Sequence, residues 1–231
     1  MQYHCLREKK DSFMPKKKVL EEEKITNFAI DLFAEKGYAA TSIRDIANSL
    51  KVSSSLMYYY FKNKEELLFT ILEAIGEELL ETINKEKNKA GEPLEVMRGM
   101  IMGHIRLVQK TNKRAKLFVE EQHNLSKKYL ETINRQHRNI YDLYVDQLKK
   151  LREAGIISNE SHSVTAFAII GMIMWSYRWY KKGGSLSVED MGNQLIETFF
   201  YGIVKNPEQR SGIFNEDARH SRLVGIGAPG G

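Results

Sequence analysis

The sequence from Thr41 to Leu68, TSIRDIANSLKVSSSLMYYYFKNKEELL, decides the fold of this chain. Thr41 is placed to cap a first short helix, because a threonine hydroxyl accepts a backbone N–H of the first helical turn. The apolar residues that follow recur at helical spacing, namely Ile43, Ile46, Ala47 and Leu50. Residues 51–53 then form a tight turn, and a second helix is predicted from Ser54 to Tyr60.

The second helix is too short to be stable alone, so it must be held by packing against its neighbours. We expect Met57 and Tyr58 to face inward as anchors, which leaves the remaining positions exposed, namely Ser54, Ser55, Leu56 and Tyr59. Asn63 is predicted to cap a longer helix, whose early glutamates suit the positive helix N-terminus. Two short helices joined by a tight turn are typical of a helix-turn-helix unit, whose second helix enters the major groove of DNA.

The second predicted helix carries side chains suited to contact with DNA. Small residues at its leading end permit close approach to the bases, where a serine hydroxyl can donate or accept and Leu56 can contact a thymine methyl. Phosphate contacts are expected from Tyr59, Tyr60, Lys62 and Lys64 and from the free N–H groups of the next helix. Three tyrosines followed by a phenylalanine are also compatible with an ordinary core, so the pattern alone leaves both interpretations open.

Three segments together resemble the DNA-binding domain of the tetracycline-repressor (TetR) family of bacterial transcription regulators. They are TSIRDIA (41–47), VS (52–53) and YYYFKNKEELL (58–68), and the resemblance extends over residues 19–72. It implies base or near-base contacts by Arg44, Ser54, Leu56 and Tyr59, and phosphate contacts by Thr41, Ser42, Tyr60 and Lys64. The full set of predicted DNA-binding residues is Thr41, Ser42, Arg44, Ser53, Ser54, Ser55, Leu56, Tyr59, Tyr60, Lys62 and Lys64.

The sequence departs from the family pattern at two places. Lys51 stands where the family often has glycine, and Ser55-Leu56 stands where Gly-Thr or Gly-Ala is commoner. We expect these departures to affect which operator is bound, and not whether one is bound.

The composition of the 231 residues favours a helical protein that resides in the cytoplasm. The chain has only 4 prolines, long runs rich in Leu, Ile, Lys and Glu, and a formal net charge of +5 that suits a nucleic-acid partner. Cys5 is the single cysteine, which excludes an intramolecular disulfide and fits a reducing compartment. No signal peptide is recognisable, and the most apolar stretch, Val164 to Trp175, is shorter than the roughly 20 residues of a membrane-spanning helix.

We predict an all-α fold of about nine helices, in which a three-helix helix-turn-helix domain precedes a larger ligand-binding and dimerisation domain. Residues 1–15 form a disordered arm, 16–63 the DNA-binding domain, 64–205 the effector and dimerisation domain, and 206–231 a disordered tail. The predicted helices outside the helix-turn-helix are Val19–Lys36, Lys64–Asn88, Leu94–Lys110, Arg114–His123, Lys127–Ala154, His162–Lys181 and Val188–Val204. The helix from Lys64 is expected to act as a stiff lever between the two domains.

The last two predicted helices are apolar over most of their circumference, with Val164, Phe167, Met172 and Trp175 in one, and Leu195, Phe199 and Phe200 in the other. A helix that is apolar all round is buried on all sides. A domain of this size has few helices to cover both, so we expect a twofold homodimer in which these helices meet their copies as a four-helix bundle. A twofold dimer also suits a palindromic operator with half-sites about one turn apart. The alternative is a monomer in which both helices lie in the core.

A second resemblance concerns the C-terminal half. WSYRWYKKGG (175–184) and LSVED (186–190) are similar to the C-terminal domain of TetR members that control fatty-acid or steroid breakdown and respond to acyl-CoA thioesters. The resemblance covers residues 118–202 and implies an acyl-CoA or related lipid effector. Adaptable methionines and aromatic residues suit an acyl tunnel, and Arg178, Lys181 and Lys182, or Arg135 and Arg138, suit the CoA phosphates. The ligand-binding candidates are Met100, His104, Phe118, Gln122, Tyr141, Tyr144, Met172, Trp175 and Arg178.

Two other functions are also compatible with the sequence. A drug-efflux regulator would need a pocket for cationic aromatic compounds, with its carboxylate supplied by Glu120 or Glu121. A helical lipid-binding protein or enzyme would not bind DNA at all, although no glycine-rich phosphate loop, nucleophile motif or paired catalytic carboxylates are present. His104, His123 and His137 lack the spacing of metal ligands, so we expect neither a metal nor a cofactor.

Overall fold

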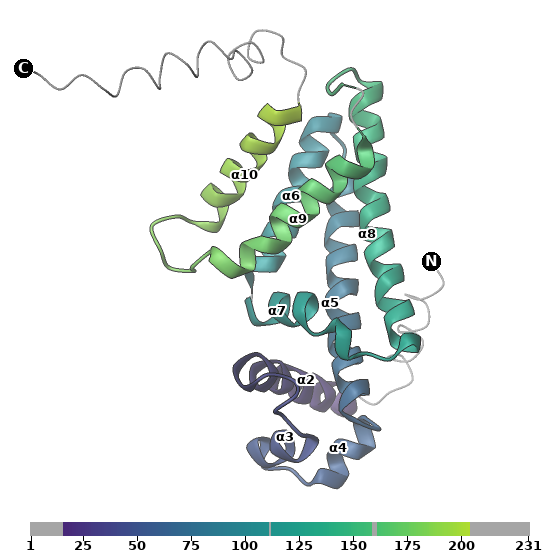
Figure 1. Ribbon diagram of the computed structural model, residues 1–231, viewed down its shortest axis with the longest axis vertical. Coiled ribbons are helices and arrows are strands. Elements are labelled where there is room, and N and C mark those ends of the chain that lie inside the picture. Colours follow the sequence, from purple (N-terminus) through teal and green to yellow (C-terminus); the bar gives the residue numbers. More distant parts are fainter. Residues whose placement is uncertain (1–15, 111, 159–160, 204–231) are drawn as a thin grey trace, which may run out of the picture.

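The structure, a computed structural model, describes residues 16–203 except 111, 159 and 160. The predicted arm, the predicted tail and Cys5 lie outside the described residues. The described part contains nine α-helices and one short 3-10 turn (Figure 1), namely α2 (Lys16–Lys36), α3 (Ile43–Leu50), α4 (Ser54–Tyr60), α5 (Lys64–Lys87), α6 (Pro93–Lys110), α7 (Asn112–Glu120), η1 (Gln122–Asn124), α8 (Lys127–Glu153), α9 (His162–Trp179) and α10 (Val188–Ile203). The predicted all-α fold class is therefore confirmed.

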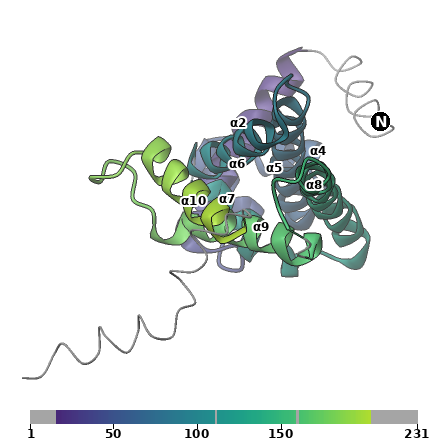
Figure 2. The ribbon, with the colours of Figure 1, turned by 90° about the horizontal axis from the view of Figure 1, so that it is seen from above.

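The molecule has two lobes joined by α5 (Figure 1). Helices α2, α3 and α4 form the N-terminal lobe, and α5 continues from this lobe into the C-terminal lobe, where it packs between α6 and α8. Helix α7 lies across the junction and packs on α2, while α10 packs on α6. Figure 2 shows α8 and α10 on opposite sides of the C-terminal lobe, with α9 along one flank.

Two hydrophobic cores fill the molecule, and their boundary does not coincide with the predicted domain boundary. The C-terminal core gathers residues of α5, α6, α8, α9 and α10, including Met97, Met100, Tyr144 and Ile173. The N-terminal core gathers the inward faces of α2, α3, α4 and the first half of α5. It also contains four buried residues from beyond α6, namely Leu117, Phe118, Leu125 and Ile133. The end of α7 and the start of α8 therefore belong to the packing of the N-terminal lobe, whereas Ala115 of α7 packs in the C-terminal core.

Helix α3 begins one residue later than predicted, and its cap is Ser42 instead of Thr41. The Ser42 side chain accepts from the backbone N–H of Asp45, and the Asp45 carboxylate accepts from the backbone N–H of Ser42 at 2.8 Å, which completes a capping box. Thr41 is buried and its hydroxyl donates to the carbonyl of Gly37 at 2.9 Å. This hydrogen bond ties the start of α3 to the end of α2.

Lys51 ends α3 in the left-handed conformation with φ of 57°. It is the only described residue other than glycine with positive φ. The left-handed region costs an L-residue with a side chain roughly 1–2 kcal/mol, whereas glycine adopts it freely. Glycine, which the family often has at this position, would therefore adopt this backbone conformation without that cost.

Three C-terminal predictions need correction in detail. The predicted helix 114–123 is divided into α7 and η1, and α9 ends at Trp179 and not at Lys181. Helix α10 is not apolar all round, because Ile196, Phe199 and Phe200 are buried while a polar stripe is exposed. That stripe consists of Glu189, Asp190, Asn193, Gln194, Glu197 and Thr198.

Helix α9 does present an exposed apolar face. Val164, Phe167, Trp175 and Trp179 are 68%, 65%, 57% and 48% exposed, although the opposite face of the helix is buried. Ala168 and Gly171 lie in the same row, at the three-and-four spacing that places residues on one helical face. We call this surface the α9 face.

Candidate functional site

Helix α4 presents its outer surface to solvent at the end of the N-terminal lobe (Figure 1). Ser53 caps it by accepting from the N–H of Leu56 at 3.1 Å, and Met57 is fully buried beneath it. Ser55 and Tyr59 are exposed, while Ser54 and Leu56 are half-buried. The helix is therefore held from below by Met57 and from its N-terminus by Ser53.

Tyr58 was predicted to face inward, and this is wrong, because its side chain is 53% exposed. The inward positions belong to Met57 and Phe61, which lie four residues apart and are both buried. Tyr58 follows Met57 by one residue, so it points about 100° away from that buried face. Its exposure adds a tyrosine to the outer surface that the sequence analysis missed.

A surface hollow of about 690 Å³ lies beside α4. Its lining includes the cations of Arg44, Lys62 and Lys64 and contains no carboxylate. The other lining residues are Ala39, Ala40, Thr41, Ser42, Ile43, Tyr58 and Asn63. This hollow, which we call the basic hollow, brings together five residues predicted to bind DNA with the newly exposed Tyr58.

Three predicted phosphate-binding groups already have partners within the chain. The Thr41 hydroxyl is bonded to Gly37, and the Tyr60 hydroxyl donates to the Glu21 carboxylate at 2.7 Å. Nζ of Lys64 donates to the carbonyl of Tyr38 at 2.9 Å and lies 4.1 Å from the centroid of that ring. Desolvation and the hydrogen bond to Glu21 raise the pKa of Tyr60 to about 12. Arg44 and Ser55 are exposed without such intramolecular contacts in the described structure, whereas Ser42 and Ser53 serve as caps.

The nine predicted ligand-binding residues fall into separate places of the C-terminal lobe. Met100, His104 and Tyr144 are fully buried together: Nδ1 of His104 lies 3.1 Å from the Tyr144 hydroxyl, which is 3.5 Å from the Met100 carbonyl. Burial lowers the pKa of His104 to about 3 and raises that of Tyr144. Nε2 of His104 has no hydrogen-bond partner in the described structure.

The other candidates lie at four further positions. Gln122 donates to the Phe118 carbonyl, and Phe118 packs edge-on against His137 with centroids 5.1 Å apart. Tyr141 donates to Ser163 at 2.7 Å and packs on Phe167. Arg178 lies 4.9 Å from the Trp175 ring on the exposed side of α9, and Met172 is half-buried. The structure therefore does not gather the candidates into one cavity.

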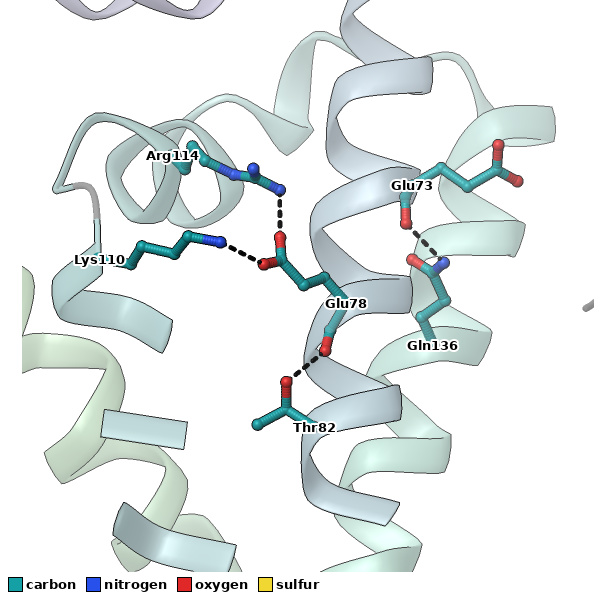
Figure 3. A network of polar contacts seen from close by, with 6 residues as sticks. All are labelled: Glu73, Glu78, Thr82, Lys110, Arg114 and Gln136. Carbon is teal, nitrogen blue, oxygen red and sulfur yellow. Dashed lines mark hydrogen bonds and ion pairs between the residues drawn. The ribbon is translucent and has the colours of Figure 1, made fainter. Parts of the chain in front are cut away.

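Ion pairs join α7 to both lobes. Nζ of Lys113 lies 2.9 Å from the carboxylates of both Asp31 and Glu35 on α2, which raises its pKa. Arg114 pairs with Glu78 of α5 at 2.7 Å, and Lys110 of α6 reaches the same carboxylate at 3.1 Å (Figure 3).

Helix α9 is tied to α7 as well. The Tyr177 hydroxyl donates to Glu120 at 2.7 Å, so burial and this hydrogen bond raise the pKa of Tyr177 to about 12. Arg178 approaches the same carboxylate at 3.7 Å. Helix α7 therefore makes polar contacts with α2, α5 and α9 at once.

Comparison with known proteins assigns both halves of the chain. Residues 25–71 match the family described as bacterial regulatory proteins, tetR family, and residues 90–203 match the tetracyclin repressor-like C-terminal domain. The chain belongs to the TetR family. This confirms the family predicted from the 41–68 motif, and DNA-binding transcription regulation follows as its general function.

Relatives and solved structures of the TetR family agree with this assignment. The HTH-type transcriptional repressor KstR2 of Mycolicibacterium smegmatis is 27% identical over 197 residues, which cover 83% of this chain and 95% of the relative. The structure of the ketosteroid transcriptional regulator KstR2 of Mycobacterium tuberculosis has a TM-score of 0.74 at 24% identity, covering 80% of this chain and 96% of that one. AibR in complex with isovaleryl coenzyme A and operator DNA has a TM-score of 0.72 at 24% identity, covering 78% and 97%. At such identities the structural likeness shows the fold.

Two other kinds of site are absent from the described part of the chain. Within residues 16–203, leaving aside 111, 159 and 160, no helix combines the length and the apolar character needed to span a membrane. In the same part of the chain, no three His, Cys, Asp or Glu side chains are grouped so that they could hold a metal ion.

Proposed function

We propose that this TetR-family protein is a repressor that binds a palindromic operator as a homodimer and is released from it by a lipid thioester. The observation that carries the DNA-binding site is the basic hollow, whose cations are those of Arg44, Lys62 and Lys64. Phosphate groups bind such a surface, and the adjoining exposed residues of α4, Ser55 and Tyr59, are then directed at base edges.

Hydrogen bonds within the free protein determine which of these side chains can bind phosphates. Lys64 is positioned by Tyr38, so its ammonium group is fixed before DNA arrives and retains donors for a phosphate. Thr41 is buried, so we assign its hydroxyl to holding the start of α3 and not to a phosphate. Tyr58 takes its place as a candidate contact, since it lines the same hollow.

The α9 face supports the dimer. Four large apolar side chains lie along it, each about half exposed or more. A row of this kind on one helix is suited to burial against a second copy, because a twofold axis brings the same surface of both subunits together. The exposed stripe of α10 is polar, so we assign the apolar centre of the interface to α9.

The effector class is proposed from the relatives. KstR2 is named as a ketosteroid regulator, and AibR is solved with isovaleryl coenzyme A, so steroid and acyl-CoA chemistry occur among proteins of this fold. The C-terminal core contains three buried methionines of α6, Met97, Met100 and Met102, whose flexible side chains adapt to an apolar ligand. A drug-efflux role is less well supported, because Glu120 already accepts from Tyr177 and Glu121 from Asn124.

A gel-shift assay with the DNA upstream of the protein's own gene tests the proposal. The wild type should give a shift that weakens steeply with salt, and Tyr59→Ala and Lys64→Ala should weaken it further. A protein that gives no salt-sensitive shift, or one indifferent to both substitutions, would instead be a helical protein without a DNA-binding role.

Thermal-shift measurements with acyl-CoAs and with cationic aromatic dyes distinguish the two effector classes. Stabilisation by acyl-CoAs, together with loss of the DNA shift at the same concentrations, supports the lipid thioester. Stabilisation by the dyes alone would replace it with a multidrug effector.

A further inference from the structure

A hydrogen bond joins the first turns of α2 to the end of α4. The hydroxyl of Tyr60, the last residue of α4, donates to the Glu21 carboxylate of α2 at 2.7 Å, across 39 positions of the chain. Both side chains are half-buried. Burial and this hydrogen bond raise the pKa of Tyr60 to about 12, so the hydroxyl stays protonated and acts as a donor at neutral pH. The bond therefore anchors the outer end of the Tyr60 ring to a different helix of the N-terminal lobe.

The Tyr60 ring packs against one buried ring and one exposed ring. Its buried neighbour is Phe61, with ring centroids 6.3 Å apart. Its exposed neighbour is Tyr59, which it meets edge to face, with centroids 5.2 Å apart and an interplanar angle of 84°. Edge-to-face rings attract each other, and Tyr59 is 64% exposed on the outer surface of α4. Tyr60 therefore connects the N-terminal core with a side chain that the proposed function directs at base edges.

The single donor of Tyr60 limits what its hydroxyl can bind. A phenol has one O–H to donate, and the phosphate oxygens of DNA accept hydrogen bonds. Because this donor is given to Glu21, Tyr60 has none left for a phosphate while the bond is formed. A phosphate beside the Glu21 carboxylate would also meet a like charge. The hydrogen bond to Glu21 and a phosphate contact by Tyr60 are therefore alternatives.

We propose that Glu21 is a positioning residue for DNA recognition, which acts through Tyr60 on Tyr59. Its carboxylate holds the Tyr60 ring in one orientation, and this ring restricts the rotation of the Tyr59 ring at the DNA-binding surface. A side chain that is already ordered loses less conformational freedom on binding, so the contribution appears as affinity. The inference rests on the proposed function, because it takes Tyr59 as a base contact, and it assigns Tyr60 to positioning instead of to a phosphate.

The effect should be confined to sequence-specific binding. Affinity for DNA of any sequence comes mainly from cations that neutralise phosphates. Sequence is distinguished by the side chains that meet base edges, such as Tyr59 in the proposed function. Loss of the Glu21–Tyr60 hydrogen bond should therefore weaken binding to the operator. Binding to other DNA should change only because a negative charge has been removed.

Two substitutions of Glu21 separate the hydrogen bond from the charge. Glu21→Gln and Glu21→Ala remove the same charge, but only Glu21→Gln keeps an acceptor for the Tyr60 hydroxyl. The probes for the full-length protein are the DNA upstream of its own gene and a scrambled duplex of equal length. Fluorescence anisotropy should show that Glu21→Ala binds the upstream DNA about 3- to 10-fold more weakly than Glu21→Gln. Both variants should bind the scrambled duplex equally.

Substitutions of the two tyrosines test each step between Glu21 and the DNA. Tyr60→Phe keeps the ring and removes the donor, so Glu21→Gln and Glu21→Ala should bind the upstream DNA equally in this background. They should also be equal in a Tyr59→Ala background, because the positioned side chain is gone. Glu23, an exposed glutamate of the same helix, supplies the matched control. Glu23→Gln and Glu23→Ala should bind the upstream DNA with the same affinity.

Nuclear magnetic resonance of the free protein tests the positioning without DNA. In protein labelled with carbon-13 in its tyrosine rings, the Tyr59 signal is identified by its loss in Tyr59→Phe. This signal should differ between Glu21→Ala and Glu21→Gln, because the neighbouring Tyr60 ring changes orientation only where its acceptor is lost. Melting curves confirm that each variant is folded.

Four results overturn the inference while wild-type binding remains intact. Equal binding of the upstream DNA by Glu21→Gln and Glu21→Ala would show that the carboxylate acts only through its charge. A difference that persists in the Tyr59→Ala background would show that Tyr59 is not the side chain that is positioned. Weakening of both duplexes by the same factor in Tyr60→Phe would make Tyr60 a phosphate contact. A Tyr59 signal that is the same in both Glu21 variants would exclude the positioning. Failure of the wild type to bind either duplex refutes the proposed function itself.

Discussion

Truncation of Trp175 on the α9 face should weaken the proposed homodimer. A tryptophan side chain offers about 250 Å², so an exposed fraction of 57% leaves about 140 Å² open on each protomer. Twofold symmetry doubles this to about 280 Å², worth about 7 kcal/mol at 25 cal/mol per Å². Only part of the free energy estimated from buried area appears as free energy of association. We therefore expect Trp175→Ala to cost about 3 kcal/mol, which raises the dimer dissociation constant about 150-fold.

Analytical ultracentrifugation across a dilution series measures this constant directly. The chain has 2 tryptophans, so Trp179 remains in the variant as a fluorescent reporter of burial at the same surface. Tyr58→Ala is the matched control, because Tyr58 is exposed to a similar extent, 53%, but lies on the DNA-binding lobe. The reasoning is refuted if the wild type is monomeric at a protein concentration of about 10 µM. It is also refuted if the Trp175→Ala dimer is as tight as that of the wild type.

Four further predictions follow from local features of the structure. Lys51→Gly should relieve the left-handed strain and stabilise the protein by about 1 kcal/mol, seen as a higher melting temperature; a lower one would contradict the strain argument. Met57→Ala should destabilise the protein by about 2–5 kcal/mol in urea unfolding, because the side chain is fully buried, and a cost near zero would show that α4 is anchored otherwise. Burial holds His104 neutral and lowers its pKa in the folded state to about 3, whereas its unfolded pKa is about 6.5. The stability that depends on the neutral ring is therefore present above pH 6.5 and is lost as the pH falls toward 3. Between pH 7 and pH 5 the wild type should lose up to about 2 kcal/mol more stability than His104→Gln, and equal losses would exclude this linkage. Arg44→Ala should reduce the slope of log affinity for DNA against log salt by about one if the side chain binds a phosphate, whereas an unchanged slope would remove it from the backbone contacts.

Caps made within a few residues could be predicted from the sequence. The starts of α4 and α5 were predicted as observed, because Ser53 and Asn63 accept from N–H groups three residues onward in chain segments that need no tertiary context. The Ser42 cap was recognisable on the same grounds, since Asp45 completes a capping box three residues later. The prediction of Thr41 as the cap rested on the first hydroxyl before the helix. It overlooked the Asp45 carboxylate, which accepts from the backbone N–H of Ser42.

Which side chains of the short helix α4 face inward was harder to predict than its caps. Seven residues make about two turns, so one apolar stripe is defined by only Met57 and Phe61, and Tyr58 was assigned to it in error. The clusters of the C-terminal lobe depend on contacts across far longer separations. His104 meets Tyr144 from 40 residues away, and Glu78 meets Arg114 from 36. Helical periodicity shows which face is apolar, but it does not show which other helix that face meets.

The four residues that α7, the segment after η1 and α8 contribute to the N-terminal core limit where this protein can be divided into fragments. A fragment that stops at Gly91 would lack Leu117, Phe118, Leu125 and Ile133, leaving their buried neighbours open to water. Chimaeras that exchange C-terminal domains among TetR-family regulators therefore lack part of the N-terminal core if the splice is placed after α5. A workable graft must carry residues 112–133 together with the helix-turn-helix, although the two are separated in the chain by the whole of α6.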